Sequence, residues 1–322
     1  MRALKRVLCL AVCMTMVFAC LTGCGKKNFE GTVRVASLKG PTSMGLLELM
    51  EESEKGNTDL QYDFQMYTGA DEILPQMIQG QIDIALIPSN AAANLYQKTS
   101  GGVEVIDINT LGVLYMVTAD DSISSVEDLK GKTIVLTGQG TTPDLVLTYI
   151  LEQKGIFDDV TLDFRSEATE VVSVLAEDTS AIGLLPQPFV TAACIQNESL
   201  KVVFDMNALW DEVNPDCSIV TGVTVVRKAF AEENPDVVKA FLEDHKKSVD
   251  FVNGNPDEAA AFAVKREIVA KEPIAKKAIP NCSIVSITGD EMKKALKGYL
   301  EVIYEKNPAF IGGSLPEEDF YY

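Results

Sequence analysis

Strand-like runs that end in short polar loops and lead into helix-like runs recur along most of this chain. In the first of them, residues 32–37 form the strand and residues 44–50 the helix-like run, joined by the loop Lys39, Gly40, Pro41, Thr42 and Ser43. Gly40 and Pro41 end the strand, and Thr42 or Ser43 can cap the helix. Such a loop leaves backbone N–H groups at the positive end of the helix dipole, where they can hold a small anion or polar ligand. Taken alone, such a loop is more often an ordinary strand-to-helix turn than a ligand site.

The same succession returns further along the chain. Residues 82–87, 132–136 and 181–185 are strand-like, and the polar groups that follow them are Ser89 and Asn90, then Gly138, Gly140, Thr141 and Thr142, then Gln187. This alternation predicts an α/β fold with mostly parallel sheets flanked by helices. Ligands of such folds bind in the crevice at the carboxyl ends of the strands. Because four loops lie at such ends, we expect a binding cleft there.

Two series of strands and helices, followed by a mainly helical segment, predict two lobes. The chain is expected to cross between them near residues 112–115 and again near 221–225. The first lobe then comprises residues 31–114 and 223–322, and the second lobe comprises residues 115–222. The aromatic tail, residues 319–322, is expected to pack against the protein.

The first 23 residues have the pattern of a secretory signal. Arg2, Lys5 and Arg6 precede an apolar run too short for an ordinary membrane span, which ends in Leu-Thr-Gly before Cys24. This ending resembles the bacterial lipobox, whose cysteine is acylated after cleavage. We therefore expect a signal peptide over 1–23, a lipid anchor on Cys24, a linker over 24–30 and an extracytoplasmic body held to the membrane by lipid alone; a simple cleaved signal or an anchor helix is the alternative.

Charge and composition exclude several partners and chemistries. The net charge is −19, and loss of the three positive charges of the signal makes it more negative, which argues against nucleic acid as a partner. After Cys24 only three cysteines remain, at 194, 217 and 282, without the spacing of a metal site or a disulfide framework. Buried free thiols are expected, although one pair could form a disulfide. His245, in a polar helical run, is expected on a solvated face, so neither a metal site nor histidine-based catalysis is predicted.

The sharper catalytic and nucleotide motifs are incomplete. Gly138 and Gly140 follow a strand, but Pro143 stands where the dinucleotide fingerprint has its third glycine. Neither a Walker loop nor a Gly-x-Ser-x-Gly elbow occurs in the sequence. We expect no catalytic residue and no cofactor.

The candidate ligand-facing groups are mostly neutral. In addition to the loop residues named above they are Thr110 and Thr221, with Lys39 and Glu167 as the charged members. Each hydroxyl can equally serve as a cap. Trp210 and Tyr115 could stack on a planar ligand, although core packing is the more common use of such residues.

Several stretches together resemble a known family. The lipobox, Leu-Lys-Gly-Pro-Thr after the first strand, Gly-Gln-Ile-Asp-Ile-Ala at 80–85 and Asp-Leu-Lys-Gly-Lys at 128–132 resemble solute-binding lipoproteins of ABC importers. The branch is that of the nitrate, sulfonate, taurine and thiamine-pyrimidine binders with the type II periplasmic binding fold. The resemblance implies a monomeric clamshell that closes on a small molecule and docks on a permease with a cytosolic ATPase. Its binding loops carry over onto residues 40–43, Ser89 and Asn90, 138–142, and Gln187.

The ligand remains open at this point. Helix N-termini and hydroxyls suit an oxyanion, yet the sequence offers no obvious cleft arginine, and Glu167 follows a strand of the second lobe. A carboxylate repels an anion and attracts an amine, so we expect an amine-bearing heterocycle, such as a vitamin precursor, slightly ahead of a sulfonate, nitrate or taurine. Glu167 could instead only cap the helix after it. A ligand-sensing subunit of a membrane receptor and an enzyme on the same fold are the alternative functions.

Overall fold

The computed structural model describes residues 29–215 and 217–322, of which Thr32–Tyr322 form one compact unit. The expected signal peptide (1–23), the lipid-bearing Cys24 and most of the 24–30 linker lie outside the described residues. In the part of the chain that is described, no helix is both long enough and apolar enough to cross a membrane. Everything below concerns the compact unit.

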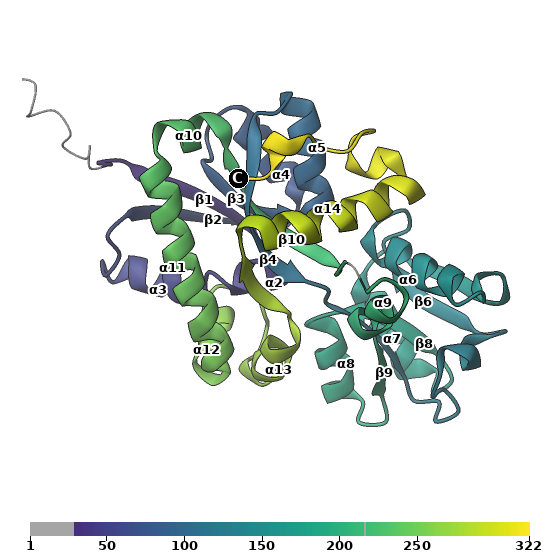
Figure 1. The fold of residues 1–322 in the computed structure, drawn as a ribbon. Coiled ribbons are helices and arrows are strands. Elements are labelled where there is room, and N and C mark those ends of the chain that lie inside the picture. Colours follow the sequence, from purple (N-terminus) through teal and green to yellow (C-terminus); the bar gives the residue numbers. More distant parts are fainter. Residues whose placement is uncertain (1–28, 216) are drawn as a thin grey trace, which may run out of the picture. The chain divides into compact units, whose positions relative to one another are not determined.

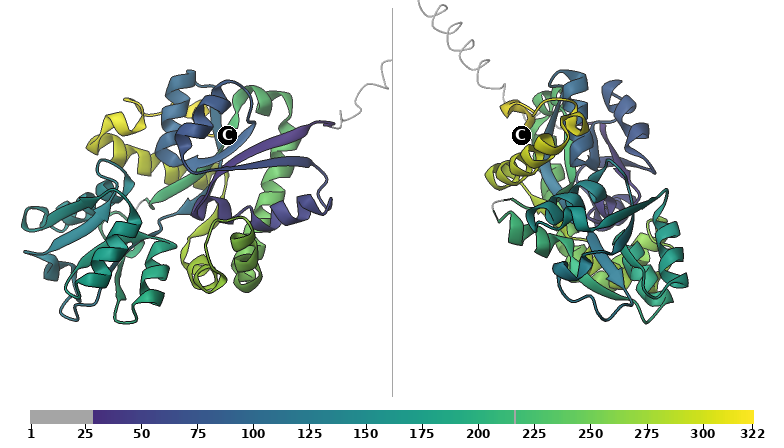
Figure 2. Two further views of the ribbon diagram at one scale, coloured as in Figure 1. Left: turned by 180° about the vertical axis from the view of Figure 1, so that it is seen from behind. Right: turned by 90° about the vertical axis from the view of Figure 1, so that its right-hand side faces the viewer.

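The first sheet has six strands in the order β11-β4-β10-β3-β1-β2 (Figure 1). β1 pairs in parallel with β2 and β3, whereas β10 is antiparallel to both of its neighbours, and β11 is antiparallel to β4. Seen from behind, β1 and β2 lie at the side of this sheet remote from the second sheet (Figure 2, left). The strands are β1 Thr32–Leu38, β2 Gln61–Tyr67, β3 Ile84–Pro88, β4 Val103–Leu111, β10 Val220–Arg227 and β11 Ile284–Ile287.

The second sheet has five strands in the order β7-β6-β8-β5-β9, and its pairing repeats that of the first. β6 is parallel to β7 and β8, while β5 is antiparallel to β8 and β9. The strands are β5 Leu114–Thr118, β6 Thr133–Thr137, β7 Thr161–Arg165, β8 Ile182–Pro186 and β9 Lys201–Asp205.

The expected α/β class with two helix-flanked sheets is confirmed, but each sheet is mixed rather than mostly parallel. The reason is the path of the chain between the sheets. It leaves the first sheet between β4 and β5, and it returns between β9 and β10. β10 then inserts between β3 and β4 in the opposite direction to β3, an arrangement that strand-helix alternation alone does not reveal.

Thirteen α-helices cover the two sheets in the described part of the chain. They are α2 Pro41–Met44, α3 Leu47–Glu54, α4 Ala70–Ile78, α5 Ser89–Thr99, α6 Thr142–Gln153, α7 Ala168–Glu177, α8 Phe189–Gln196, α9 Met206–Val213, α10 Lys228–Glu233, α11 Pro235–Gly254, α12 Pro256–Lys265, α13 Glu272–Ala278 and α14 Gly289–Lys306. Short 3-10 turns add η1 Val126–Leu129, η2 Phe157–Asp159, η3 Ile279–Asn281, η4 Pro308–Ile311 and η5 Glu318–Phe320. The helix-like run after β1 is two helices, α2 and α3, separated at Gly45 and Leu46.

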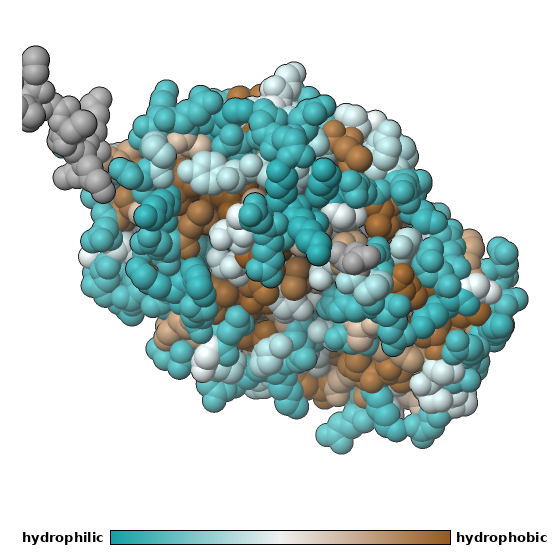
Figure 3. Space-filling view, in the orientation of Figure 1, coloured by the Kyte–Doolittle hydropathy of each residue, from teal (hydrophilic) through white to brown (hydrophobic). Residues whose placement is uncertain are grey.

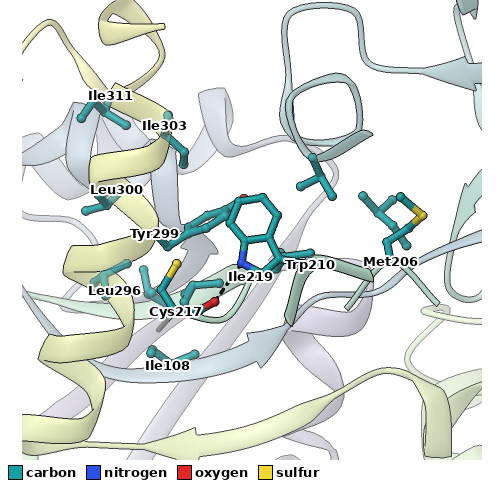
Figure 4. Close-up of a cluster of buried hydrophobic side chains, with 14 of the residues drawn as sticks. Ile108, Met206, Trp210, Cys217, Ile219, Leu296, Tyr299, Leu300, Ile303 and Ile311 are labelled. Carbon is teal, nitrogen blue, oxygen red and sulfur yellow. Dashed lines mark hydrogen bonds between the residues drawn. The ribbon is translucent and has the colours of Figure 1, made fainter. Parts of the chain in front are cut away.

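One hydrophobic cluster runs through both sheets. It joins β-strand residues of the first sheet with Leu136 on β6 of the second sheet and Val146 on α6, and it passes through Trp210 and Tyr299 (Figure 4). Trp210 is fully buried, and its indole Nε1 donates a hydrogen bond of 2.8 Å to the carbonyl oxygen of Cys217. Trp210 therefore has the core-packing role that was expected to be the more common one, and its ring faces and its donor are not available to a ligand.

His245 is also placed differently from the expectation of a solvated face. Its side chain is fully buried, and Nδ1 lies 2.7 Å from Oδ2 of Asp107 on β4. Phe241, one turn earlier on α11, stacks on the imidazole ring. The polar residues next to His245 in sequence lie on the outer side of α11. The polar composition of this run therefore gives no sign that His245 itself lies on the inner, buried side of the helix.

The cysteines and the tail agree with expectation. Cys194, Cys217 and Cys282 form no disulfide, the last two are buried, and burial raises the pKa of Cys282 to about 12. Phe320 is fully buried against Tyr96.

Candidate functional site

The hydroxyl groups predicted in the loop after β1 lie in α2 and bond within the fold; neither Thr42 nor Ser43 caps the helix, because Gly40 is the N-cap residue. Thr42 and Ser43 are buried, and the hydroxyl oxygens of Ser43 and Ser37 lie 2.6 Å apart. Ser43 also donates to the carbonyl oxygen of Leu38. These hydroxyls fix the turn out of β1, whereas Lys39 at the start of the loop is exposed.

The same loop meets the returning strand β10 at Gly222. A Cβ atom on Gly222 would lie 2.5 Å from Oδ1 of Asn109 and 2.6 Å from Cγ2 of Thr42, so only glycine fits. Thr110, also buried, donates a hydrogen bond of 2.9 Å to Oδ1 of Asn109. The structure thus brings Thr42 and Thr110 together. Sequence reasoning missed Asn109 and Gly222, although a glycine inside a buried strand is itself a sign of close approach.

The loop after β3 is shorter than expected, because α5 begins at Ser89. Ser89 and Asn90 therefore lie in the first turn of α5 instead of preceding it. Ser89 donates a hydrogen bond of 2.6 Å to the carbonyl oxygen of Val220, the first residue of β10. Thr221, the next residue, is half-buried. Ser89 thus ties α5 to the strand that returns from the second sheet.

The glycine-rich loop between β6 and α6 is closed by its own groups. Gly138 and Gly140 have positive φ values of 79° and 69°, and Thr141 donates to the carbonyl oxygen of Gly138 at 2.6 Å. The N–H of Gly140 donates to Oδ2 of Asp144, and Thr142 begins α6. Gly140 and Asp144 line a cavity of about 230 Å³ whose opposite wall is Lys306 and its neighbours at the end of α14.

Gln187 follows β8 and is buried at the border between the two sheets. Its N–H donates to the carbonyl oxygen of Val113, and its Oε1 accepts from Thr191 at 2.7 Å. Gln187 and Tyr115 line a cavity of about 310 Å³ beside α13 and η3. The Tyr115 hydroxyl donates to the carbonyl oxygen of Asn281 at 2.9 Å, which links β5 to the first-sheet side.

Glu167 stands at the N-cap position of α7, after the edge strand β7. It is exposed and makes no capping hydrogen bond through its side chain. Nearby, Arg165 donates to Oδ2 of Asp163 on the same strand at 2.6 Å. No bond joins Glu167 to the loops described above, so its expected place in a crevice stays a prediction.

An apolar groove lies near these loops, and we call it the α8 groove. It has a volume of about 500 Å³ and lies between the start of α8 and the α12–α13 segment; its lining residues are Pro188, Phe189, Ala192, Val264, Glu267, Ile268, Val269, Ala270 and Ile274. Apolar side chains reach the surface over α8 in Figure 3, and Phe189 is 37% exposed. A pocket of this size suits a small organic ligand.

One ion pair links the α8 groove to a loop that the sequence predicted. Nζ of Lys39 lies 2.9 Å from Oε2 of Glu267, and this hydrogen bond holds the pKa of Glu267 below its ordinary value. Sequence reasoning missed Glu267 because nothing in its surroundings distinguishes it from other surface glutamates. It also missed Pro188 and Phe189, which directly follow the predicted Gln187.

A second contact between the two sheet halves lies along α14, and we call it the α14 seam. It consists of Tyr149 on α6, Trp210 on α9 and Tyr299 on α14, together with the ion pair of Lys306 with Glu152. The ring centroids of Trp210 are 4.7 Å from Tyr149 and 5.7 Å from Tyr299. In Figure 1 α14 runs beside α6, while α13 lies beside α8, so the two contacts are separate.

The buried polar groups do not form a catalytic set. Ser286 donates to Oδ2 of Asp107 at 3.3 Å, and the same oxygen contacts His245. A nucleophilic triad needs the histidine between serine and carboxylate, whereas here the carboxylate lies between them. Among the described residues, no three histidine, cysteine or acidic side chains gather as metal ligands would.

Comparison with known proteins identifies relatives. A family described as NMT1/THI5 like matches residues 58–259. A Brucella abortus protein, named as a candidate binding protein, is 25% identical over 217 residues, 66% of this chain. The match spans 65% of that relative, less than two thirds of its length.

Two solved structures share the fold. An ABC transporter protein from Parabacteroides distasonis superimposes with a TM-score of 0.77 and 24% identity, over 90% of this chain and 98% of its own. The periplasmic aliphatic sulphonate-binding protein SsuA from Escherichia coli gives 0.70 and 15%, over 89% and 92%. At these identities the likeness establishes the fold, which is that of the periplasmic binding proteins.

Proposed function

This chain belongs to the NMT1/THI5-like family, and from that premise we propose that it is the extracytoplasmic solute-binding protein of an ABC importer. It captures a small molecule between two lobes, residues 31–114 with 223–322 and residues 115–222, and delivers it to a permease with its ATPase. The protein acts as a monomer and not as an enzyme. The observation that carries the proposal is the α8 groove, an apolar cavity of ligand size at the border between the two sheets.

We propose an amine-bearing solute, with a heterocycle as the first class to test and sulfonate, nitrate and taurine after it. Glu267 supports this order, because it is the one carboxylate among the residues that line the α8 groove. Glu167, the carboxylate proposed from the sequence, is exposed, and we keep it as a second candidate. A sulfonate is retained because the fold is shared with a sulphonate-binding protein.

A ligand screen tests this function. Purified protein is exposed to aminopyrimidines, sulfonates, taurine and nitrate, and binding is followed by thermal shift and calorimetry. A true ligand should raise the unfolding temperature and reduce the radius of gyration in solution scattering as the lobes close. A saturating ligand that leaves the radius unchanged would contradict capture between lobes. Glu167→Gln and Glu267→Gln, measured in parallel, identify the carboxylate that meets the amine.

The anchor is tested separately. We propose that Cys24 carries lipid and holds the protein at the outer face of the cell membrane, so Cys24→Ala should abolish lipid labelling and release the protein or block its processing. Membrane retention of a cleaved Cys24→Ala protein would contradict the proposed lipid anchor, but it would not bear on the proposed solute-binding function.

A further inference from the structure

We infer that the solute is a zwitterion with an apolar body, whose cation meets Glu267 and whose anion meets Lys39 while the body lies in the α8 groove. This inference rests on the proposed function and narrows its ligand class. It follows from the ion pair, the backbone at Glu267 and the lining of the groove.

Glu267 is held at the edge of the groove by an unusual backbone. Its φ of 57° is in the left-handed region, which side chains other than glycine and asparagine seldom adopt. The residue closes the C-terminus of α12, where the N–H of Ile268 donates to the carbonyl oxygen of Ala263 and that of Glu267 to the carbonyl oxygen of Val264, and this cap sets the direction of the side chain. The carboxylate is 80% exposed and lines the groove, so it is open to an incoming ligand.

Lys39 reaches the same carboxylate from the β1–α2 loop, 228 positions away in sequence. Its side chain is only 33% exposed, and its Nζ donates to Glu267 at 2.9 Å. The edge of the groove therefore carries one positive and one negative group that already satisfy each other.

A ligand with a single charge cannot use this pair well. An amine that takes Glu267 competes with Lys39, and an anion that takes Lys39 leaves Glu267 without its partner. An unpaired charge in a closing cleft is costly. A zwitterion inserted between the two side chains replaces one charge-assisted contact with two, and no charge is left over.

The remaining lining of the groove is the reason to expect an apolar body in the solute. Apart from Glu267 its lining residues are all apolar, and they include the exposed ring of Phe189 together with Ile268 and Ile274. Aliphatic and aromatic surfaces of this kind contribute affinity through apolar burial and ring contacts. A small zwitterion without an apolar body would leave these apolar side chains in contact with water.

Three commercial compounds separate the contributions of the two ligand charges to binding. Phenylalanine carries both, N-acetylphenylalanine only the anion, and phenylalaninamide only the cation. By calorimetry on the full protein, phenylalanine should bind at least about tenfold more tightly than either analogue, the factor that one charge-assisted hydrogen bond contributes. Glu267→Gln and Lys39→Gln should each remove this advantage, and Glu267→Gln should strengthen the binding of N-acetylphenylalanine, because Lys39 is then free for the anion and no carboxylate is left unpaired.

A matched ion pair serves as the control. Lys276 lies 3.6 Å from Asp257 with side-chain exposures of 41% and 84%, close to those of the Lys39–Glu267 pair, and neither residue lines the α8 groove. Lys276→Gln should leave the phenylalanine affinity unchanged. Equal losses in Lys276→Gln and Lys39→Gln would overturn the inference, because they would reflect net charge alone.

Two further outcomes keep the inference distinct from the proposed function. If an aminopyrimidine or sulfonate binds and closes the lobes while phenylalanine, leucine and taurine do not bind, the zwitterion is wrong and the solute-binding function stands. If none of these compounds binds and the radius of gyration never changes, the zwitterion inference and the proposed solute-binding function are both wrong.

Discussion

The two contacts between the sheet halves differ in how they are built. The α14 seam is built on packed aromatic rings: Trp210 is fully buried, and rings from α6 and α14 lie against it, while the ion pair of Lys306 with Glu152 lines a cavity of about 230 Å³. The α8 groove is an open cavity of about 500 Å³ bordered by the Lys39–Glu267 ion pair, and the hydrogen bond from Tyr115 to Asn281 joins the two sides near it. Close-packed interiors resist movement, whereas a cavity with few bonds across it can open and close at low cost.

This contrast assigns different roles to the two contacts. The α14 seam lies where the hydrophobic cluster is continuous between the sheets, so it behaves as the fixed side of the molecule. The α8 groove is lined by residues after β8 and by Glu267, which pairs with Lys39 after β1, so we propose it as the side that moves and holds the solute. Mutations should therefore affect stability at the seam and ligand binding at the groove.

The largest expected effect is at the seam. Trp210→Ala should cost about 3–5 kcal/mol of unfolding free energy, because it leaves a cavity in the continuous core. Phe189→Ala, an aromatic truncation in the groove, should cost less than about 0.5 kcal/mol, since the ring is partly exposed. Denaturant unfolding measures both. Should Trp210→Ala fail to fold, Trp210→Phe gives a smaller loss at the same site, and equal losses for Trp210→Phe and Phe189→Ala would remove the contrast.

A smaller loss is expected where β10 returns to the first sheet. Gly222→Ala places a Cβ atom 2.5 Å from Oδ1 of Asn109, and overpacking of this kind costs about 1–3 kcal/mol. Gly254→Ala, where a Cβ atom meets nothing within 4 Å, is the matched control and should be neutral. Chemical denaturation of both variants measures the two effects. A Gly222→Ala variant as stable as the natural protein would mean that the β1–α2 loop shifts at little cost to make room for the added methyl group.

Tyr115→Phe tests the bond beside the groove. Loss of the hydroxyl leaves the carbonyl of Asn281 without this donor and should cost about 1 kcal/mol, a typical net hydrogen bond. Because the bond joins the two sides, the radius of gyration of the free protein should also increase. An unchanged radius together with unchanged stability would show that the bond does not restrain opening.

The smallest expected effect is on acid stability at the groove. Lys39 lowers the pKa of Glu267, so any stabilisation by this pair is present above the ordinary value of 4.5 and is lost as the pH falls through the lowered pKa. Since the carboxylate is exposed, Glu267→Gln should leave the melting temperature at pH 7 unchanged and slightly flatten its decline below about pH 4.5. Thermal melts from pH 7 to 3 measure this. A large fall in melting temperature at pH 7 would make the pair structural.

The features that depend on local sequence pattern could be predicted from the sequence. Strands, most helices and the polar loops follow from periodicity and turn residues, and Lys39, Thr42, Thr110 and Gln187 all lie where strands end. The direction of β10 was not predictable, because its insertion between β3 and β4 depends on contacts with both strands.

The site was predictable only in part, for a related reason. Hydroxyl residues such as Ser43 and Ser89 have the same sequence signal whether they face a ligand or bond to the backbone, and in this structure they bond to Leu38 and Val220. Glu267 and Phe189 meet through chain segments far apart in sequence, so no local pattern could indicate them. His245 was misjudged because burial depends on packing partners rather than on neighbouring residues.

Distances across the two contacts test the account most directly. With Cys194, Cys217 and Cys282 replaced by alanine, spin labels at Gln196 and Lys271 span the α8 groove, and labels at Gln153 and Glu305 span the α14 seam; all four sites are exposed. Pulsed EPR should give a narrow seam distance that a saturating solute leaves unchanged, and a broader groove distance that the same solute shortens and narrows. A seam distance that shifts while the groove distance stays fixed would contradict the account.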